Sequence, residues 1–138
     1  MNLGLSCASK LQGTSKAPLI LAVEDNEDNL LIIDYIVDSF NCQFIGESDG
    51  KRTLQIAKEF QPDLILLDIM LPDLSGFDIL QCLKEDSLTR KIPVVAVTAL
   101  AMKEDEQRIQ DAGFDEYITK PFQLEDLEDI IRRYLPLR

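Results

Sequence analysis

Residues 63–76 read DLILLDIMLPDLSG, and this stretch decides the fold. Its first half, Asp63–Leu67, is an apolar run of the kind that forms a β-strand buried on both faces. Asp68 follows at once, and Pro72 and Gly76 then favour a turn, because proline fixes the chain direction and glycine permits tight geometry. A buried strand that ends in an acidic residue and a turn is typical of a parallel sheet with a ligand crevice at its carboxyl edge.

The rest of the chain alternates short apolar runs with longer amphipathic ones. Five strands alternating with five helices predict an α/β fold, a doubly wound parallel sheet with helices on both faces. We expect the flavodoxin-like (βα)5 strand order 2-1-3-4-5, with a single folded domain over 18–138 and a flexible N-terminal leader over 1–17. The predicted strands are 19–23, 43–45, 63–67, 93–97 and 116–118, and the predicted helices are 29–40, 53–60, 77–83, 99–112 (ended by Gly113) and 124–135.

Composition limits the partners and the chemistry. The 138 residues are 46% hydrophobic and carry a formal net charge of -11, with 25 acidic and 14 basic residues. Nucleic acids and anionic membranes are held mainly by Lys and Arg, so we expect no direct nucleic-acid partner and no membrane partner. Solubility alone would account for most of the acidic side chains.

Histidine is absent and the cysteines are few. Without histidine, the chain has no His nucleophile, general base or metal ligand of its own. Cys7, Cys42 and Cys82 are odd in number and widely spaced, which favours free thiols in a cytoplasmic protein. No apolar stretch resembles a signal peptide or reaches the length of a membrane span.

Acidic residues follow two of the buried strands. Glu24 and Asp25 come directly after Leu19–Val23, as Asp68 follows its strand, and the predicted order brings all three to one crevice. Like charges about 4 Å apart repel by roughly 4 kcal/mol at an effective dielectric near 20, so the cluster needs a cation. Oxygen ligands favour Mg²⁺, for which Mn²⁺ could substitute. Glu24 and Asp25 alone could equally be residues that cap the next helix.

Two further strand ends add a hydroxyl and an ammonium. Val94–Val97 leads into Thr98, and Glu116–Ile118 leads into Thr119 and Lys120. A carboxylate can attack phosphorus, while a metal ion, a hydroxyl and an ammonium can stabilise charge on the transferred oxygens. The combination predicts phosphoryl chemistry.

Four strings carry a resemblance to a known family. AVEDNEDN (22–29), LILLDIMLPDLSG (64–76), VVAVTALA (94–101) and YITKPF (117–122) look like the receiver domains of two-component response regulators. The resemblance implies a phosphoacceptor switch, at most a slow autophosphatase and otherwise not an enzyme. It takes its phosphoryl group from a histidine kinase or histidine phosphotransfer protein and signals to a downstream protein partner. The chain would be either a stand-alone, single-domain receiver or a piece of a larger regulator or hybrid kinase, and the irregular leader with its own Met1 favours the first.

The same resemblance assigns roles to residues. Asp68 would be the phosphoacceptor, and Asp25 and Asp68 would bind Mg²⁺ directly, with Glu24 acting through water and the backbone carbonyl of Met70 as a further ligand. Thr98 and Lys120 would contact the phosphoryl group, and Lys120–Pro121 would form a cis bond.

The resemblance also implies a switch. Drawing the Thr98 hydroxyl inward would open space behind it, into which Tyr117 would rotate. This rotation would alter the face over 99–134. The alternative is that Tyr117 is a strand residue that packs against a helix. The first predicted helix carries the extra apolar residues Leu31, Ile32, Tyr35 and Ile36, which would either dock a helical phosphodonor or lie buried beside the last helix. Apolar Met70 and Leu100 would exclude water and slow dephosphorylation.

Other classes fit less well. The acidic string EDNEDN argues against a flavin-binding loop, and no glycine-rich loop with lysine supports a P-loop nucleotidase. A phosphatase of the dehalogenase type would need a second aspartate where Met70 stands. The remaining alternative is a receiver-like adaptor that acts only by protein contacts.

Overall fold

A computed structural model describes residues 17–99 and 102–136 of the chain. Its sheet has five parallel strands in the order β2-β1-β3-β4-β5, as the sequence predicted. The strands are β1 (Leu19–Val23), β2 (Gln43–Glu47), β3 (Leu64–Asp68), β4 (Val94–Thr98) and β5 (Glu116–Thr119).

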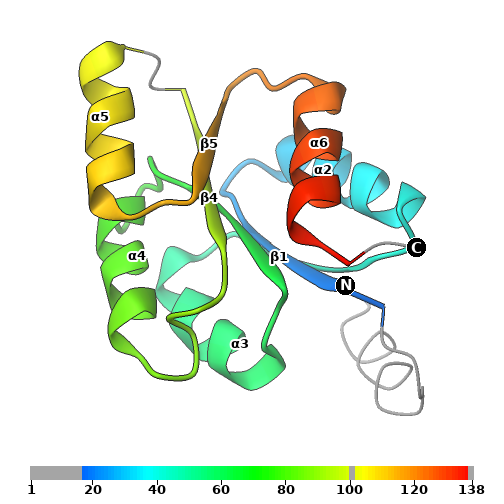
Figure 1. The fold of residues 1–138 in the computed structure, drawn as a ribbon, viewed down its shortest axis with the longest axis horizontal. Coiled ribbons are helices and arrows are strands. Elements are labelled where there is room, and N and C mark those ends of the chain that lie inside the picture. The colour runs from blue at the N-terminus through cyan, green and yellow to red at the C-terminus, as the bar shows by residue number, and fades with distance from the viewer. Residues whose placement is uncertain (1–16, 100–101, 137–138) are drawn as a thin grey trace.

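Helices cover both faces of this sheet (Figure 1). On one face, α3, α4 and α5 pack over inward side chains such as Leu67 and Ala96; on the other, α2 and α6 pack over Leu66 and Val95. Every residue of β1, β3 and β4 is buried, because a parallel strand in the middle of such a sheet has no solvent side. The helices are α2 (Glu27–Ser39), α3 (Thr53–Phe60) after the 3₁₀ turn η1 (Gly50–Arg52), α4 (Gly76–Glu85), α5 (Lys103–Ala112) and α6 (Leu124–Tyr134).

Three helices begin at other residues than the sequence predicted: α4 by one residue, at Gly76, and α2 and α5 by more. α2 begins at Glu27 and not at Asn29, because the Asn26 side chain caps it and accepts a hydrogen bond from the Asn29 backbone N–H. α5 begins at Lys103 and not at Ala99, because Met102 is extended and its backbone N–H donates to the Asp105 carboxylate at 3.3 Å. α5 ends, as predicted, at Gly113, whose φ of 106° lies in the left-handed region.

Some predictions fall where the structure gives no description. Residues 1–16 of the predicted leader lie outside the described residues, and so do Leu100 and Cys7. Cys42 and Cys82 are free thiols, as predicted. Within the described part of the chain, no helix is long and apolar enough to cross a membrane.

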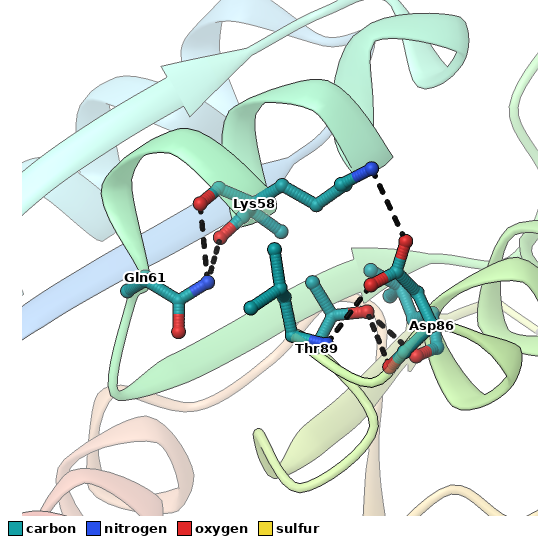
Figure 2. A network of polar contacts seen from close by, with 7 residues as sticks. Lys58, Gln61, Asp86 and Thr89 are labelled. Carbon is teal, nitrogen blue, oxygen red and sulfur yellow. Dashed lines mark hydrogen bonds and ion pairs between the residues drawn. The ribbon is translucent and has the colours of Figure 1, made fainter.

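A polar network ties the end of α3 to the turn after α4 (Figure 2). Lys58 Nζ lies 3.3 Å from the Asp86 carboxylate, and the buried Thr89 hydroxyl donates to the Leu83 carbonyl at 2.6 Å. The Gln61 side chain donates to the carbonyls of Ala57 and Lys58 at the end of α3. We call this set the α3–α4 clamp; it lies at the amino edge of the sheet, where the strands begin.

Candidate functional site

The carboxyl edge of the sheet, where the strands end, brings three acidic side chains together. Glu24 directly follows β1 and continues its ladder, since its backbone N–H donates to the Glu47 carbonyl at 2.9 Å. Asp68 is the last residue of β3, one residue further into the strand than predicted. One carboxylate oxygen from each of Glu24, Asp25 and Asp68 lies within 4.8 Å of the others.

These carboxylates differ in burial. Glu24 and Asp68 are only 2% and 3% exposed, whereas Asp25 is exposed to solvent. Glu24 also accepts a hydrogen bond from the Asn26 backbone N–H at 3.0 Å, and Asp68 accepts one from the Met70 backbone N–H at 2.9 Å. The site therefore combines two buried carboxylates with a third that is exposed, and we use the word pocket for the space between these three side chains.

Lys120 reaches into this pocket from the end of β5. Its Nζ lies 2.7 Å from Glu24 Oε1 and 3.0 Å from Asp68 Oδ2. The position of the Lys120 backbone is fixed, because its N–H donates to the Thr98 carbonyl at 2.7 Å and the Lys120–Pro121 bond is cis. One ammonium thus bridges the two buried carboxylates.

The charges in the pocket shift one another's ionisation. Burial raises the pKa of Glu24, and the negative charge of Asp68 raises it further, although the hydrogen bond with Lys120 acts in the opposite direction. Burial alone would lower the pKa of Lys120, but its hydrogen bonds to Glu24 and Asp68 outweigh this effect and raise it. Lys120 is therefore charged at neutral pH, and the pocket keeps an excess of negative charge.

The donor set fits a hard divalent cation. Three carboxylates close together, with no nitrogen or sulfur ligand among them, match the all-oxygen coordination that Mg²⁺ prefers. One ammonium, which pairs with only two of the three carboxylates, leaves part of their negative charge uncompensated. The residues that could hold such an ion are Glu24, Asp25 and Asp68, beside the backbone of Met70.

The loop after β3 is shaped by a close approach that the sequence alone did not reveal. A Cβ atom on Gly76 would lie 2.6 Å from the Ile69 Cα and 2.8 Å from the Asp68 carbonyl oxygen. Gly76 is thus required for space at the start of α4, and not for unusual backbone angles. The Ser75 side chain caps α4 by accepting from the Phe77 backbone N–H, a role that the sequence reading did not assign.

The two residues expected to form the switch lie on neighbouring strands. Thr98 ends β4 and is fully buried, and Tyr117 lies in β5 with 36% of its surface exposed. A hydrogen bond with the Glu106 carboxylate on α5 raises the pKa of the Tyr117 phenol. Glu106 was missed by the sequence reading, because its only signal is that it belongs to the run of acids that opens α5.

Known proteins resemble this chain in sequence and in fold. The family described as response regulator receiver domain matches residues 20–132. The polar-differentiation response regulator DivK of Brucella anthropi is 41% identical over 116 residues, which cover 84% of this chain and 94% of the relative.

Solved structures agree with the fold described above. The receiver domain of sensor histidine kinase PA1611 from Pseudomonas aeruginosa, with a magnesium ion coordinated in its active site cleft, is 30% identical and aligns with a TM-score of 0.78 over 86% of this chain and 97% of its own. Chemotaxis protein CheY4 of Vibrio cholerae, 23% identical, aligns with a TM-score of 0.80 over 86% of this chain and 99% of its own, and so shares the fold. The chain therefore belongs to the response regulator receiver domain family.

Proposed function

We propose that this chain is a phosphoacceptor switch that takes a phosphoryl group onto Asp68 from a phosphohistidine on a partner protein. The observation that supports this most is the setting of the Asp68 carboxylate. One oxygen accepts the Met70 backbone N–H and the other lies against Lys120 Nζ, with the oxygens of Glu24 and Asp25 close by. An oxygen of Asp68 would attack phosphorus as the bond from phosphorus to the donor imidazole breaks, which leaves an acyl phosphate here and a free histidine on the donor.

The surrounding residues would bind and orient the transferred group. A Mg²⁺ ion held by Glu24, Asp25, Asp68 and the Met70 backbone carbonyl would supply positive charge next to the phosphoryl oxygens. Lys120 would exchange part of its contact with Asp68 for a phosphoryl oxygen, and the Thr98 hydroxyl would bond another. Apolar Met70, exposed beside Asp68, would hinder an attacking water, so that the chain is at most a slow autophosphatase and otherwise not an enzyme.

The output of the switch would pass through the face over 99–134. Movement of Thr98 toward the phosphoryl group would open space into which Tyr117 turns, and this would change the surface formed by α5, β5 and α6. The exposed ring of Tyr117 is compatible with the unmodified state of such a switch. We propose a downstream protein as the reader of this face, with no direct nucleic-acid or membrane partner, because of the net charge of -11.

The donor would dock on α2. Response regulator receivers act with histidine kinases in phosphorelays, and here we propose a histidine kinase or a histidine phosphotransfer protein as phosphodonor. Ile33, Ile36 and Val37 of α2 pack inward, but Leu31 is 67% exposed and Tyr35 76%, so burial beside the last helix does not account for them. These exposed apolar side chains lie on the helix that begins two residues after Asp25, and a helical donor would lie along it.

We further propose bounds for the domain and a cellular location for the chain. The receiver domain would span 18–138, since the Pro18 carbonyl already accepts the Gln43 backbone N–H at 2.7 Å, with a leader before it. The free thiols Cys42 and Cys82 favour the cytoplasm as its location.

A direct test is phosphorylation by a small donor. Incubation with Mg²⁺ and acetyl phosphate should add the mass of one phosphoryl group, measured by mass spectrometry of the intact chain. Asp68→Asn should abolish this gain, while Asp73→Asn, which alters an exposed acid in the same loop, should retain it. No gain in the unsubstituted chain would instead support the adaptor alternative.

A further inference from the structure

Two hollows lie on either side of Tyr117. They belong to the face formed by α5, β5 and α6, whose arrangement Figure 1 shows. Each has a volume of about 310 Å³, and Tyr117 and Glu116 line both. One hollow is bounded by α5 and the other by α6. We call the two hollows with the tyrosine between them the Tyr117 surface.

The charged residues of the Tyr117 surface are almost all acidic. Its five carboxylates face a single guanidinium, and these residues are Glu106, Asp115, Glu116, Asp126, Asp129 and Arg133. The guanidinium is already engaged, because Arg133 pairs with Glu116, which also accepts from the Tyr134 hydroxyl at 2.8 Å. Of the described cations, none forms an ion pair with Glu106, Asp115 or Asp126, so negative charge remains there for a partner.

The floor of the Tyr117 surface supplies apolar contact beneath this charge. Ile109 and Phe114 line the hollow beside α5, and Ile118 and Ile130 line the one beside α6. Together with the exposed ring of Tyr117, these buried side chains line the same two hollows as the five carboxylates. This arrangement suits an occupant with the opposite distribution, an apolar side chain flanked by positive charges.

We propose that the Tyr117 surface docks a Lys- or Arg-rich segment of the downstream protein, with an apolar side chain of that segment seated beside Tyr117. This inference rests on the proposed function and names the chemistry of its reader. A second copy of the chain fits poorly, because two-fold pairing would set one group of carboxylates against the other. Nucleic acid and anionic lipid are repelled for the same reason.

Glu106 connects this docking to the switch. Glu106 and Tyr117 line the same hollow beside α5, and interaction with the Glu106 carboxylate raises the pKa of the Tyr117 phenol. When Tyr117 turns inward, that carboxylate loses its partner and becomes available to a Lys or Arg of the docked segment. Phosphorylation therefore increases the affinity of the Tyr117 surface for a cationic segment.

A synthetic peptide tests the docking. The probe has one tryptophan flanked by lysine pairs, and the comparison peptide carries glutamates in place of the lysines. Both are titrated into the ¹⁵N-labelled full chain with Mg²⁺, before and after acetyl phosphate treatment. We expect the lysine peptide to shift backbone amide signals of α5, β5 and α6 around Tyr117, to bind more tightly after phosphorylation, and to weaken as salt is added.

Matched substitutions separate this surface from general acidity. Glu106→Gln and Asp126→Asn should each weaken peptide binding about threefold, as expected for single exposed charge pairs. Asp34→Asn and Asp38→Asn remove exposed acids from α2 and should leave binding unchanged. Shifts confined to α2 or to the carboxylate pocket, or equal losses in both sets of variants, would overturn the proposal.

Two further outcomes keep the proposals distinct. Sedimentation showing a dimer that Glu106→Gln disrupts would assign the Tyr117 surface to a second copy and overturn the cationic occupant. If the chain gains no phosphoryl mass but the peptide still binds around Tyr117, docking stands and the phosphoacceptor proposal fails. If phosphoryl mass is gained but the peptide shifts no amide signals of the Tyr117 surface in either state, the phosphoacceptor proposal stands and the docking proposal fails.

Discussion

The two edges of the sheet use their acidic residues in opposite ways. At the amino edge, Asp63 accepts a hydrogen bond from the Leu19 backbone N–H and Asp115 accepts one from that of Val94, each at 2.8 Å. At the carboxyl edge, the two buried carboxylates, Glu24 and Asp68, converge on a single ammonium. The same residue type thus joins strands at one edge and crowds negative charge at the other.

This difference separates the stability of the fold from its chemistry. At the amino edge each acidic group has a fixed donor, and the α3–α4 clamp adds further matched pairs (Figure 2). At the carboxyl edge the polar groups oppose one another, and their arrangement becomes favourable only when positive charge is added. Predictions that perturb one edge or the other can test this division.

The largest effect is expected from removing the ammonium at the carboxyl edge. Lys120→Met would leave Glu24 and Asp68 buried without a counter-charge, which should lower the free energy of unfolding by about 3 kcal/mol. Urea denaturation at neutral pH with a metal chelator present would measure this loss. Lys103→Met, which removes an exposed lysine from α5, is the matched control and should change the free energy little. Equal losses in the two variants would show that the pocket carries no unusual strain between charges.

Added Mg²⁺ should act at the carboxyl edge alone. At a concentration about a hundred times its Kd, a ligand that binds only the folded state raises the free energy of unfolding by about 2.7 kcal/mol. Asp25→Asn removes the exposed carboxylate of the pocket and should reduce this gain without unfolding the chain. Thermal melts with and without Mg²⁺ would measure it, with Asp73→Asn as control. If Mg²⁺ stabilised Asp25→Asn as much as the unsubstituted chain, the ion would bind at a site other than these three carboxylates.

Two buried threonines, Thr89 in the clamp and Thr53 at the start of α3, offer a matched test of hydrogen bonding. Thr89→Val removes the donor to the Leu83 carbonyl and should cost about 2 kcal/mol, because a buried acceptor loses its partner. Thr53 is equally buried, but among the described residues its hydroxyl has no hydrogen-bond partner, so Thr53→Val should cost nothing or stabilise by about 1 kcal/mol. Urea midpoints of the two variants would separate them. Similar losses in both would mean that shape, and not hydrogen bonding, sets the cost.

The sequence was sufficient to predict a parallel sheet, and the choice of the flavodoxin-like strand order among the few that right-handed crossovers allow predicted the convergence of the acids. Continuous apolar strands are visible in any window, and residues at the carboxyl ends of parallel strands must meet at one edge. Glu24, Asp25, Asp68 and Lys120 could therefore be brought together before any coordinates, and the family resemblance added their expected roles.

Contacts between side chains on different elements could not be predicted in this way. Periodicity gave no sign that Gly76 is needed because the Ile69 backbone passes so close to it, or that α5 would start only at Lys103. Acids on solvent-facing helices look alike in sequence, so nothing marked Glu106 as the partner of Tyr117 or Glu116 as the partner of Tyr134. Such pairs depend on how helices sit on the sheet, which local pattern does not encode.

The smallest expected effect concerns one of these unpredicted pairs, the Tyr134–Glu116 contact, which resembles the satisfied pairs of the amino edge. Burial, reinforced by the hydrogen bond to Glu116, raises the pKa of Tyr134 to about 12. The folded chain therefore keeps the phenolic proton to a higher pH than the unfolded chain, whose tyrosine ionises near the ordinary value of 10.0. The stabilising contribution is complete below pH 10 and is lost as the pH rises to about 12. Alkaline titration of tyrosinate absorbance should show a late phase near pH 12 that Tyr134→Phe removes and that both Tyr35→Phe and Tyr117→Phe retain. If the late phase survives in Tyr134→Phe, it belongs to another tyrosine, and the hydrogen bond with Glu116 does not raise the pKa of Tyr134. The hollow beside α6 would then lack the paired carboxylate that distinguishes it from the carboxyl edge of the sheet.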